Sequence, residues 1–511
     1  MNKTLLKKYT DLMGKAREQA VFSQAEGILQ WDMRTKMPPG GGELRSQELA
    51  LLSGIGHRMN TSPELEKLLK GIEQHADYGS LTLLQKRNIH LIRKDFDEQT
   101  ALPEELVVEM RRQSAIANNV WRKAKAANKW QMFRPELEKN VELAKRKAGL
   151  LMKVKKTATP YDALLDGYEP EMPERDISKL FGELQKGLET LLGKVMRSPK
   201  QPDVSILERK VPVDIQRRIA TALAETIQYD VTSDKAKGRI DETEHPFTVG
   251  NYDDVRITTH FYEDRFAYAV QSVMHEAGHA LYHLNLNPDW KFQPVGHPCS
   301  MGLNESQSRT VQNIIGKSED FWVYFLPRLK KLTGDTLRGV SVERFVHALN
   351  GVAPSKIRVE ADEVTYGLHI IVRFNIERDL FAGKIAVKDL PEIWNASYKK
   401  SLGIDIETDS EGVMQDTHWS GGSFGYFPSY TLGDMYSAQL LGKMESDIPH
   451  WRKELRKGNF SPVKQWLADK VHSQGQLYDP SVLIKKITGS KLTAKPYLAY
   501  LNSKYSKLYG F

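Results

Sequence analysis

Cysteine is almost absent from this sequence of 511 residues, in which Cys299 stands alone. That count excludes a disulfide framework and a cysteine-rich zinc site, and it fits a reducing compartment. Long apolar runs are missing too. The stretch 321–326 (FWVYFL) ends at Pro327, far short of the ~20 residues that a membrane span needs. Residues 1–19 lack the apolar core of a signal peptide. We therefore expect a cytoplasmic protein that is not associated with a membrane.

Positive charge is in excess, with a formal net charge of +8, but it is not gathered into a stripe. Lysine and arginine alternate with glutamate along predicted helices such as residues 134–156, which is typical of a solvated amphipathic face. We therefore predict no nucleic-acid partner. A hydrophobic content of 40% and a charged content of 27% describe an ordinary globular protein.

Helical periodicity runs through most of the chain, without a repeat or a low-complexity linker, so we predict a single, mainly α domain spanning residues 1–511. We expect irregular segments at 31–42 and 159–175, a long helix over 355–382 and a glycine-rich, aromatic loop at 411–433. The one clear β pattern lies in residues 244–262, where Val255 and Ile257 alternate with polar residues. An exposed edge strand there could pair with an extended peptide.

The most informative stretch follows this β pattern. Residues 264–285 have apolar side chains at spacings of three and four, which predicts a helix. His275, Glu276 and His279 form the pattern H-E-x-x-H within it. Residues four apart lie one above the other on a helix, so both imidazoles can reach one ion, and Glu276 can reach a water beside that ion. We predict a metal site with His275 and His279 as ligands and Glu276 as general base.

A catalytic zinc ion takes three protein ligands and keeps one position for water. Glu305 is the better candidate for the third ligand, because it is an anionic residue in a new helical pattern that follows a glycine- and proline-containing loop. His283, one helical turn beyond His279, is a weaker competitor. As a fourth ligand it would close the site and indicate a non-enzymatic helical protein with a structural zinc. We predict one Zn²⁺ per chain, with Co²⁺ or Mn²⁺ as alternatives.

Six ordered motifs carry a family resemblance. They are His245-Pro246-Phe247, Asp254-x-Arg256-x-Thr258, His275-Glu276-x-x-His279, Glu305-Ser306-Gln307, Ile357-Arg358-x-x-Ala361-Asp362 and Gly412-x-x-Gln415-Asp416-x-His418-Trp419. With the early segment 29–41 (LQWDMRTKMPPGG), the sequence resembles the carboxypeptidase Taq family of zinc metallocarboxypeptidases. It departs from the family at Asn304, where a histidine usually precedes the glutamate signature.

The resemblance implies a large, elongated helical fold with a deep active-site cleft, usually assembled as a homodimer. It also implies a metal-dependent carboxypeptidase with broad specificity. Such an enzyme would remove single residues from the free C-termini of peptides and would usually disfavour a C-terminal proline. A metal-activated water, with Glu276 as general base, would hydrolyse the bond.

The resemblance also suggests roles for residues outside the metal site. Arg358 resembles the family's anchor for the substrate carboxylate, which suits a planar guanidinium, although a helical ion pair with Asp362 would also explain it. Arg256 is the second candidate for that anchor. His245 and Gln415 complete the predicted substrate side, where they would shape the site or orient its ligands.

His418, Tyr426 and Tyr430, from the glycine-rich loop, are candidate donors to the oxyanion of the tetrahedral intermediate, although ordinary aromatic packing would also explain them. An endo-oligopeptidase or a dipeptidyl carboxypeptidase with the same zinc ligands is the alternative activity. Dependence on a free substrate carboxylate would separate these activities.

Overall fold

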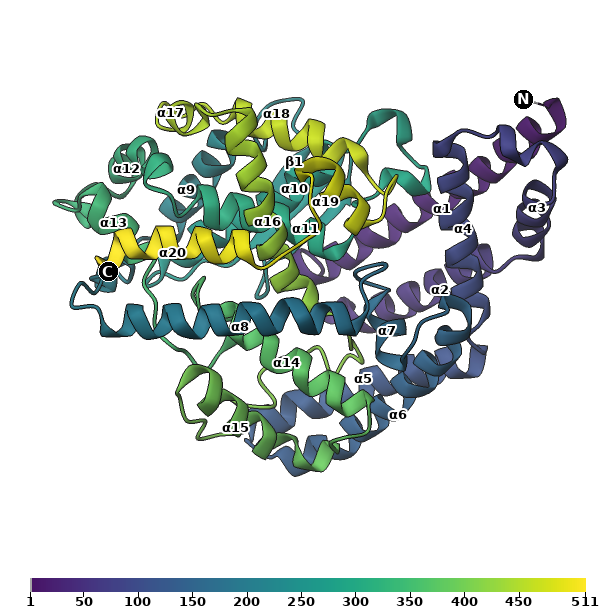
Figure 1. Ribbon diagram of the computed structural model, residues 1–511, viewed down its shortest axis with the longest axis horizontal. Coiled ribbons are helices and arrows are strands. Elements are labelled where there is room, and N and C mark those ends of the chain that lie inside the picture. The colour runs from purple at the N-terminus through teal and green to yellow at the C-terminus, as the bar shows by residue number, and fades with distance from the viewer. Residues whose placement is uncertain (1) are drawn as a thin grey trace.

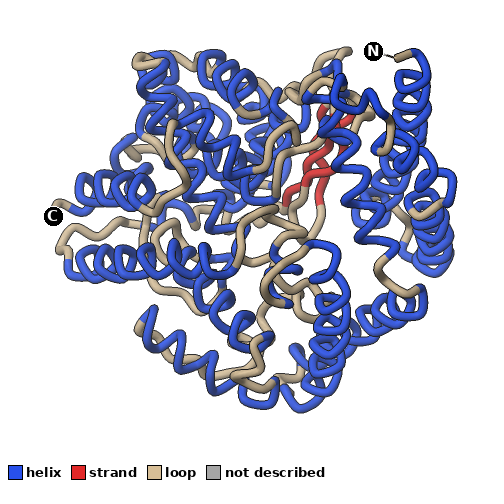
Figure 2. The backbone as a smooth tube through the Cα atoms, turned by 45° about the vertical axis from the view of Figure 1, so that its right-hand side comes forward, coloured by secondary structure: helices blue, strands red, loops and turns tan. Residues whose placement is uncertain are grey.

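A computed structural model describes residues 2–511, and helices account for 69% of the chain (Figures 1 and 2). The first part contains α1 (Lys3–Thr35), α2 (Gly42–Asn60), α3 (Pro63–Glu73), α4 (Leu83–Thr100), α5 (Glu104–Ala126), α6 (Trp130–Lys155), α7 (Pro160–Leu165), α8 (Glu174–Arg197) and α9 (Val213–Thr226). The middle part contains β1 (Gly238–Glu242), β2 (Thr248–Asn251), β3 (Asp254–Thr259), α10 (Phe266–Leu284), α11 (Met301–Arg309), a π-helical segment (Thr310–Ile315), α12 (Glu319–Thr333) and α13 (Val342–Leu349). The last part contains α14 (Tyr366–Phe381), α15 (Leu390–Leu402), α16 (Pro428–Asp447), α17 (Trp451–Leu455), α18 (Ser461–Lys470), α19 (Pro480–Thr488) and α20 (Lys495–Tyr509). The predicted mainly α fold class is confirmed.

Helix α8 illustrates why these segments are helical. Its buried residues Ile177, Phe181, Leu184 and Leu188 recur at spacings of three and four, so one face enters the core. Acidic residues occupy its first turn and basic residues its last turn, which complements the helix dipole. Helix α20 lies beside it, at the end of the molecule where the chain finishes (Figure 1).

The three strands form one sheet (Figure 2) with the order β1-β3-β2, and in the chain β3 comes directly before α10, the helix that carries the H-E-x-x-H motif. Strand β3 pairs parallel with β1, placing Ile257 opposite Ile240, and antiparallel with β2, placing Ile257 opposite Thr248. Val255 and Ile257 are buried, as the alternation predicts. Strand β2 therefore forms one edge of the sheet, as the peptide-pairing hypothesis requires.

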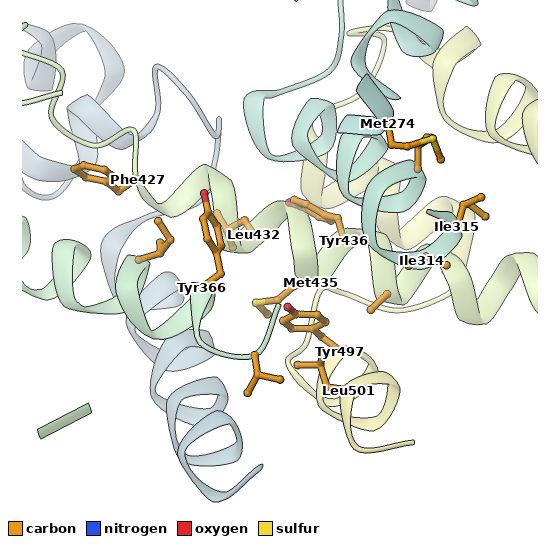
Figure 3. Close-up of a cluster of buried hydrophobic side chains, with 14 of the residues drawn as sticks. Met274, Ile314, Ile315, Tyr366, Phe427, Leu432, Met435, Tyr436, Tyr497 and Leu501 are labelled. Carbon is orange, nitrogen blue, oxygen red and sulfur yellow. The ribbon is translucent and has the colours of Figure 1, made fainter. Parts of the chain in front are cut away.

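Two hydrophobic cores hold the chain. A small core joins α1, α3 and α4 through residues such as Leu12, Leu69 and Ile89. The main core extends from α5 to α20. Figure 3 shows the part in which Met274 of α10, Ile314 of the π-helical segment and Met435 of α16 lie among buried side chains. The helices that carry the candidate site are thus packed against one another.

Three local predictions need correction. Helix α1 continues through the start of the expected break at 31–42 to Thr35, and Trp31 is buried beneath the guanidinium groups of Arg239 and Arg256. The expected irregular segment 159–175 contains the short helix α7, which begins with a capping box between Thr159 and Asp162. The predicted helix 355–382 starts only at Tyr366. No helix among residues 2–511 combines the length and apolar character needed to cross a bilayer.

Candidate metal centre

His275, His279 and Glu305 come together in the structure. The two histidines lie on α10 and Glu305 lies on α11, and their ligand atoms are all within 4.8 Å of one another. Oε2 of Glu305 lies 3.7 Å from Nε2 of His275 and 3.4 Å from Nε2 of His279. Ligand atoms ~2.0–2.2 Å from a tetrahedral zinc ion stand roughly 3.3–3.6 Å apart. The three residues therefore fit one divalent ion.

The far nitrogen of each imidazole is occupied. Nδ1 of His275 lies 2.9 Å from Oε1 of Gln312, which also accepts a hydrogen bond from Arg309, so His275 is the donor at Nδ1. Nδ1 of His279 lies 3.1 Å from Oδ1 of Asn304. A proton held at Nδ1 leaves the lone pair of Nε2 free for a metal. Asn304 therefore supports a ligand although it replaces the family's usual histidine.

The charge of Glu305 is fixed by a buried arginine. Nε of Arg309 donates to Oε1 of Glu305 at 2.7 Å, and Oγ of Ser308 donates to Oε2 at 3.1 Å. Burial raises the pKa of Glu305, but Arg309 and the two histidines outweigh it and hold the pKa well below its usual range. Glu305 is therefore an ionised carboxylate, as a metal ligand must be.

Close helix packing sets the position of the ligands. A Cβ atom on Gly278, inside the H-E-x-x-H motif, would lie 2.6 Å from the backbone oxygen of Gln307, so α10 touches α11 there. A Cβ atom on Gly433 would lie 2.6 Å from Cγ of Glu305, so α16 presses on the ligand itself. Any larger residue at either position would displace a ligand helix.

Glu276 is buried beside the ligands. Its Oε2 accepts a hydrogen bond of 2.7 Å from Oγ1 of Thr248 in β2, and Thr248 also contacts the backbone oxygen of Glu276. The edge strand therefore fixes the carboxylate that we predict to be the general base.

The predicted oxyanion donors gather in one cluster, which together with Arg358 over the ring of Tyr430 we call the loop side of the site. Nε2 of His418 lies 3.2 Å from the hydroxyl of Tyr430, and the rings of Tyr426 and Tyr430 are 5.1 Å apart. Burial raises the pKa of both tyrosines and lowers that of His418 to about 4, so all three are neutral near pH 7. Tyr430 lies in the first turn of α16 and not in the loop, which ends at Phe427.

Arg358 belongs to a network of two arginines and one carboxylate. Asp416 accepts from Arg358 at 2.8 Å and from Arg373 at 2.6 Å, which leaves the group with a net positive charge. Oε1 of Gln415 accepts from the backbone nitrogen of Arg358 at 2.8 Å, so Gln415 positions the arginine. Asp362 instead caps the turn before α14 by accepting from Val364 and Thr365, so the helical Arg358–Asp362 pair is absent.

The two remaining predicted residues lie at the sheet. Arg256 in β3 donates to both oxygens of Asp254, and its guanidinium lies 4.3 Å over the ring of Trp31. His245 is exposed in the turn between β1 and β2. Arg256 is therefore already neutralised by one carboxylate, whereas the network of Arg358, Arg373 and Asp416 keeps one unbalanced positive charge.

His283 does not join the metal ligands. Its Nδ1 lies 2.6 Å from Oδ1 of Asn251, and within residues 2–511 the ligand cluster contains His275, His279 and Glu305 alone. Burial lowers the pKa of His283 to about 3, so it is a neutral core residue. The cluster thus has the three-ligand pattern of a catalytic site and not the four ligands of a structural zinc.

Two buried glutamates support the site, and sequence reasoning missed both. Glu377 in α14 accepts hydrogen bonds from Trp419, Gly425 and Tyr161 at 2.7–2.9 Å, which holds the loop before α16. Glu169 accepts from the backbone of Gly302 at 3.1 Å and from Tyr436 at 2.6 Å, which holds the start of α11. Burial raises the pKa of each to about 7. Neither position follows from a local pattern, because three of their five partners lie more than a hundred residues away, and Trp419 and Gly425 lie 42 and 48 residues away.

The chain is similar to known proteins over nearly its full length. Residues 11–505 match the carboxypeptidase Taq (M32) metallopeptidase family. A protein from Thermus thermophilus named thermostable carboxypeptidase 1 is 40% identical, covering 98% of this chain and 99% of the relative. Carboxypeptidase 1 from Bacillus subtilis is 37% identical, covering 99% of each. The crystal structure of the M32 carboxypeptidase from Deinococcus radiodurans has a TM-score of 0.94 at 34% identity, covering 99% of this chain and 100% of that one.

Proposed function

From the premise that this chain belongs to the carboxypeptidase Taq (M32) metallopeptidase family, we propose that it removes single residues, with broad specificity, from the free C-termini of peptides. Its general class, a metallopeptidase with carboxypeptidase activity, follows from family membership. The observation that carries the proposal is the ligand cluster beside Glu276, which Tyr366 links to an arginine network of net positive charge. The hydroxyl of Tyr366 accepts a hydrogen bond from Arg358, and its ring lies under Arg309, which holds Glu305.

His275, His279 and Glu305 would hold one divalent ion, whose chemistry when bound is Lewis acidity toward water and the scissile carbonyl. We propose Zn²⁺ as that ion, because two imidazoles and one carboxylate suit it, with Co²⁺ or Mn²⁺ as substitutes. The side chains of His275 and His279 keep 20% and 15% of their exposure, so a substrate can reach this position.

Glu276 is proposed to take the proton of the attacking water and to deliver it to the departing amine. Thr248 orients its carboxylate through the hydrogen bond to Oε2. Because β2 is an edge strand, a peptide in extended form could pair beside it and present its last peptide bond to Glu276.

Charge developing on the substrate oxygen would be stabilised by neutral donors on the loop side. Tyr426 and Tyr430 keep their hydroxyl protons near pH 7, and His418 is a neutral imidazole with one N–H; all three are proposed for this role. Burial gives their hydrogen bonds more weight than they would have in water.

Arg358 is proposed to bind the substrate's terminal carboxylate. Two guanidinium groups share the single carboxylate of Asp416, so a second carboxylate would balance the charge. The planar fork of arginine matches a carboxylate with two hydrogen bonds. This anchor would place the last residue of the peptide beyond the scissile bond and thereby restrict cleavage to one residue.

The decisive experiment compares one peptide as the free acid and as the C-terminal amide, incubated with metal-loaded protein and analysed by mass spectrometry. We expect stepwise loss of single residues from the free acid alone, and a chelator should abolish it. A panel of C-terminal residues tests the breadth of specificity. Internal cuts in both peptides would indicate an endo-oligopeptidase, and cleavage in pairs a dipeptidyl carboxypeptidase.

The assembly and location are proposed on the same premise. We propose a cytoplasmic homodimer in which each chain is one domain, from the family resemblance and the single cysteine. Light scattering coupled to size-exclusion chromatography would give the mass in solution, and a mass of one chain would exclude the dimer.

A further inference from the structure

A cavity lies apart from the candidate metal centre. Its volume is about 740 Å³, and it opens between α12, α13, the C-terminal half of α16 and α20. We call it the α20 cavity. Much of its wall is apolar, formed by residues such as Val323, Val346, Leu441 and Leu508. The volume lies within the range of ~300–1,000 Å³ that small-ligand sites occupy.

The charged groups of the α20 cavity are unequal in number. Its lining contains two more cationic side chains, counting lysine and arginine together, than glutamates. Most of these cations already have ion-pair partners. Lys504 pairs with Glu363 at 2.6 Å, and Lys507 pairs with Glu319 at 3.1 Å. The ammonium group of Lys317 has neither an ion pair nor a hydrogen bond within residues 2–511. Lys317 is therefore the cation that can pair with an anionic ligand.

Burial makes this free cation unfavourable. It lowers the pKa of Lys317 to about 8, although Glu363 and Asp362 act in the opposite direction. A half-buried ammonium beside apolar side chains gains most from an anion that comes with its own apolar surface. A carboxylate on an aliphatic chain has both features, and the remaining wall of the cavity would cover that chain.

The cavity also shares a structural element with the metal centre. Ile314, in the π-helical segment, and Lys317, just after it, both line the cavity. Gln312, in the same segment, holds Nδ1 of His275, and Arg309, directly before it, holds Glu305. A π-helical turn inside a helix is rare and often marks a functional position. A ligand that shifts Ile314 would thus move a segment that orients two metal ligands.

We propose that the α20 cavity binds a small amphiphilic carboxylate, with its anionic head on Lys317, and that occupancy changes turnover at the metal centre through the π-helical segment. The binding half of the proposal is independent of the enzyme's activity. The effect on turnover rests on the proposed function.

Binding is tested by isothermal titration calorimetry of decanoate into the metal-free full-length protein, in which no ion can attract the carboxylate. We expect saturable binding of one decanoate per chain. Lys317→Met keeps an unbranched side chain of similar length without the charge and should weaken binding about tenfold or more. Gly442→Leu should abolish binding, because Gly442 lines the cavity and a Cβ atom there meets nothing within 4 Å.

Gly149→Leu is the matched control, since Gly149 is also a helical glycine whose Cβ atom would meet nothing within 4 Å, but it lies on α6 outside the cavity. It should bind decanoate as the unmodified protein does. Absence of saturable binding would overturn the proposal. So would binding that Lys317→Met and Gly442→Leu leave unchanged, because the anion would then sit elsewhere.

Turnover is then measured with the metal-loaded protein and a short peptide. We expect decanoate to change kcat in the unmodified protein and in Gly149→Leu, but not in Gly442→Leu. Purely competitive inhibition of equal strength in all three proteins would place decanoate at the metal centre and overturn the regulatory half. Lack of peptide cleavage without decanoate would contradict the proposed function and leave the calorimetric result standing.

Discussion

The three candidate metal ligands, on what we call the metal side, stand on the regular helices α10 and α11, whereas Arg358 and His418 on the loop side lie outside the α-helices, before α14 and α16. On the metal side, the spacing of His275 and His279 follows from one helical turn. On the loop side, Arg358 is held in place by the hydrogen bonds that it donates to Gln415 and Asp416, and His418 by its hydrogen bond with Tyr430.

The difference shows how one site combines two kinds of rigidity. The metal side is fixed by close backbone packing, as at Gly278 and Gly433, and by hydrogen bonds behind each ligand. The loop side is fixed by buried charges, Asp416 between two arginines and Glu377 beneath the loop. A metal needs ligands at set distances, while a substrate needs donors that close around its changing shape. Substitutions on the metal side should therefore change metal affinity, whereas substitutions on the loop side should change kcat/KM.

The largest effect is expected from Glu305→Ala, which removes an anionic ligand from the metal side. Loss of a residue that only supports a ligand costs about 10- to 100-fold in metal affinity, so loss of the ligand should exceed that and abolish activity. Inductively coupled plasma mass spectrometry after dialysis measures the retained metal. Unchanged metal content would remove Glu305 from the ligand set.

Glu276→Ala should separate metal binding from chemistry on the same side. The variant loses the general base and no ligand, so kcat should fall by about 10²- to 10⁴-fold while metal content is retained. Thr248, which holds Glu276, offers the milder variant Thr248→Val. Loss of metal from Glu276→Ala would contradict the assignment of Glu276 as base.

Arg358→Lys tests the anchor on the loop side. Lysine keeps the charge next to Asp416 but loses the planar fork, so kcat/KM for a free-acid peptide should fall about 10- to 100-fold with metal content unchanged. Arg256→Lys is the matched comparison. A larger loss of kcat/KM in Arg256→Lys than in Arg358→Lys would indicate that Arg256, in the sheet, is the carboxylate anchor.

The two buried glutamates test whether the sides are separable. In Glu377→Gln, the amide NH₂ must face a donor, either Trp419 or Gly425, so the loop should shift and kcat/KM should fall about tenfold with metal affinity unchanged. Glu169→Gln should instead weaken metal binding, because Glu169 holds the start of α11. Equal effects of both variants on metal affinity would show that the sides act as one unit.

The smallest effect concerns acid stability on the loop side. Burial lowers the pKa of His418 from its ordinary 6.5 to about 4, although Asp416 opposes the shift. Between pH 6.5 and 4, His418 is protonated in the unfolded chain but neutral in the folded chain. Proton binding therefore favours the unfolded chain, and His418 lowers the free energy of unfolding as the pH falls toward 4. The limit is about 3 kcal/mol.

Urea unfolding of the metal-free protein at pH 6.5 and 4.5 measures this loss. His418→Gln should reduce the difference between the two pH values, whereas His450→Gln, at an exposed histidine, should leave it unchanged. An undiminished difference in His418→Gln would assign the acid sensitivity to other groups.

Much of the fold and half of the site were predictable from local patterns. The spacing in residues 264–285 predicted the helix, the H-E-x-x-H motif predicted that His275 and His279 lie together, and the alternation at Val255 and Ile257 predicted a strand. The error at 355–365 has a physical cause. Arg358 and Asp362 suit a helical pair, but in the folded chain Asp416 attracts the arginine and Asp362 caps the turn before α14. A long-range ion pair thus outweighed a local preference.

The sequence by itself determined the ligand types, their helical spacing and the family, because one turn of helix brings His275 and His279 together wherever that helix lies. Only the tertiary structure decided which nitrogen of each imidazole is free, since Gln312 lies 37 residues from His275 and meets it through packing of the π-helical segment. Tertiary packing also placed Glu377 beneath the loop, 48 residues from Gly425. Local geometry sets spacing within an element, whereas partners distant in sequence meet only when the core brings their elements together.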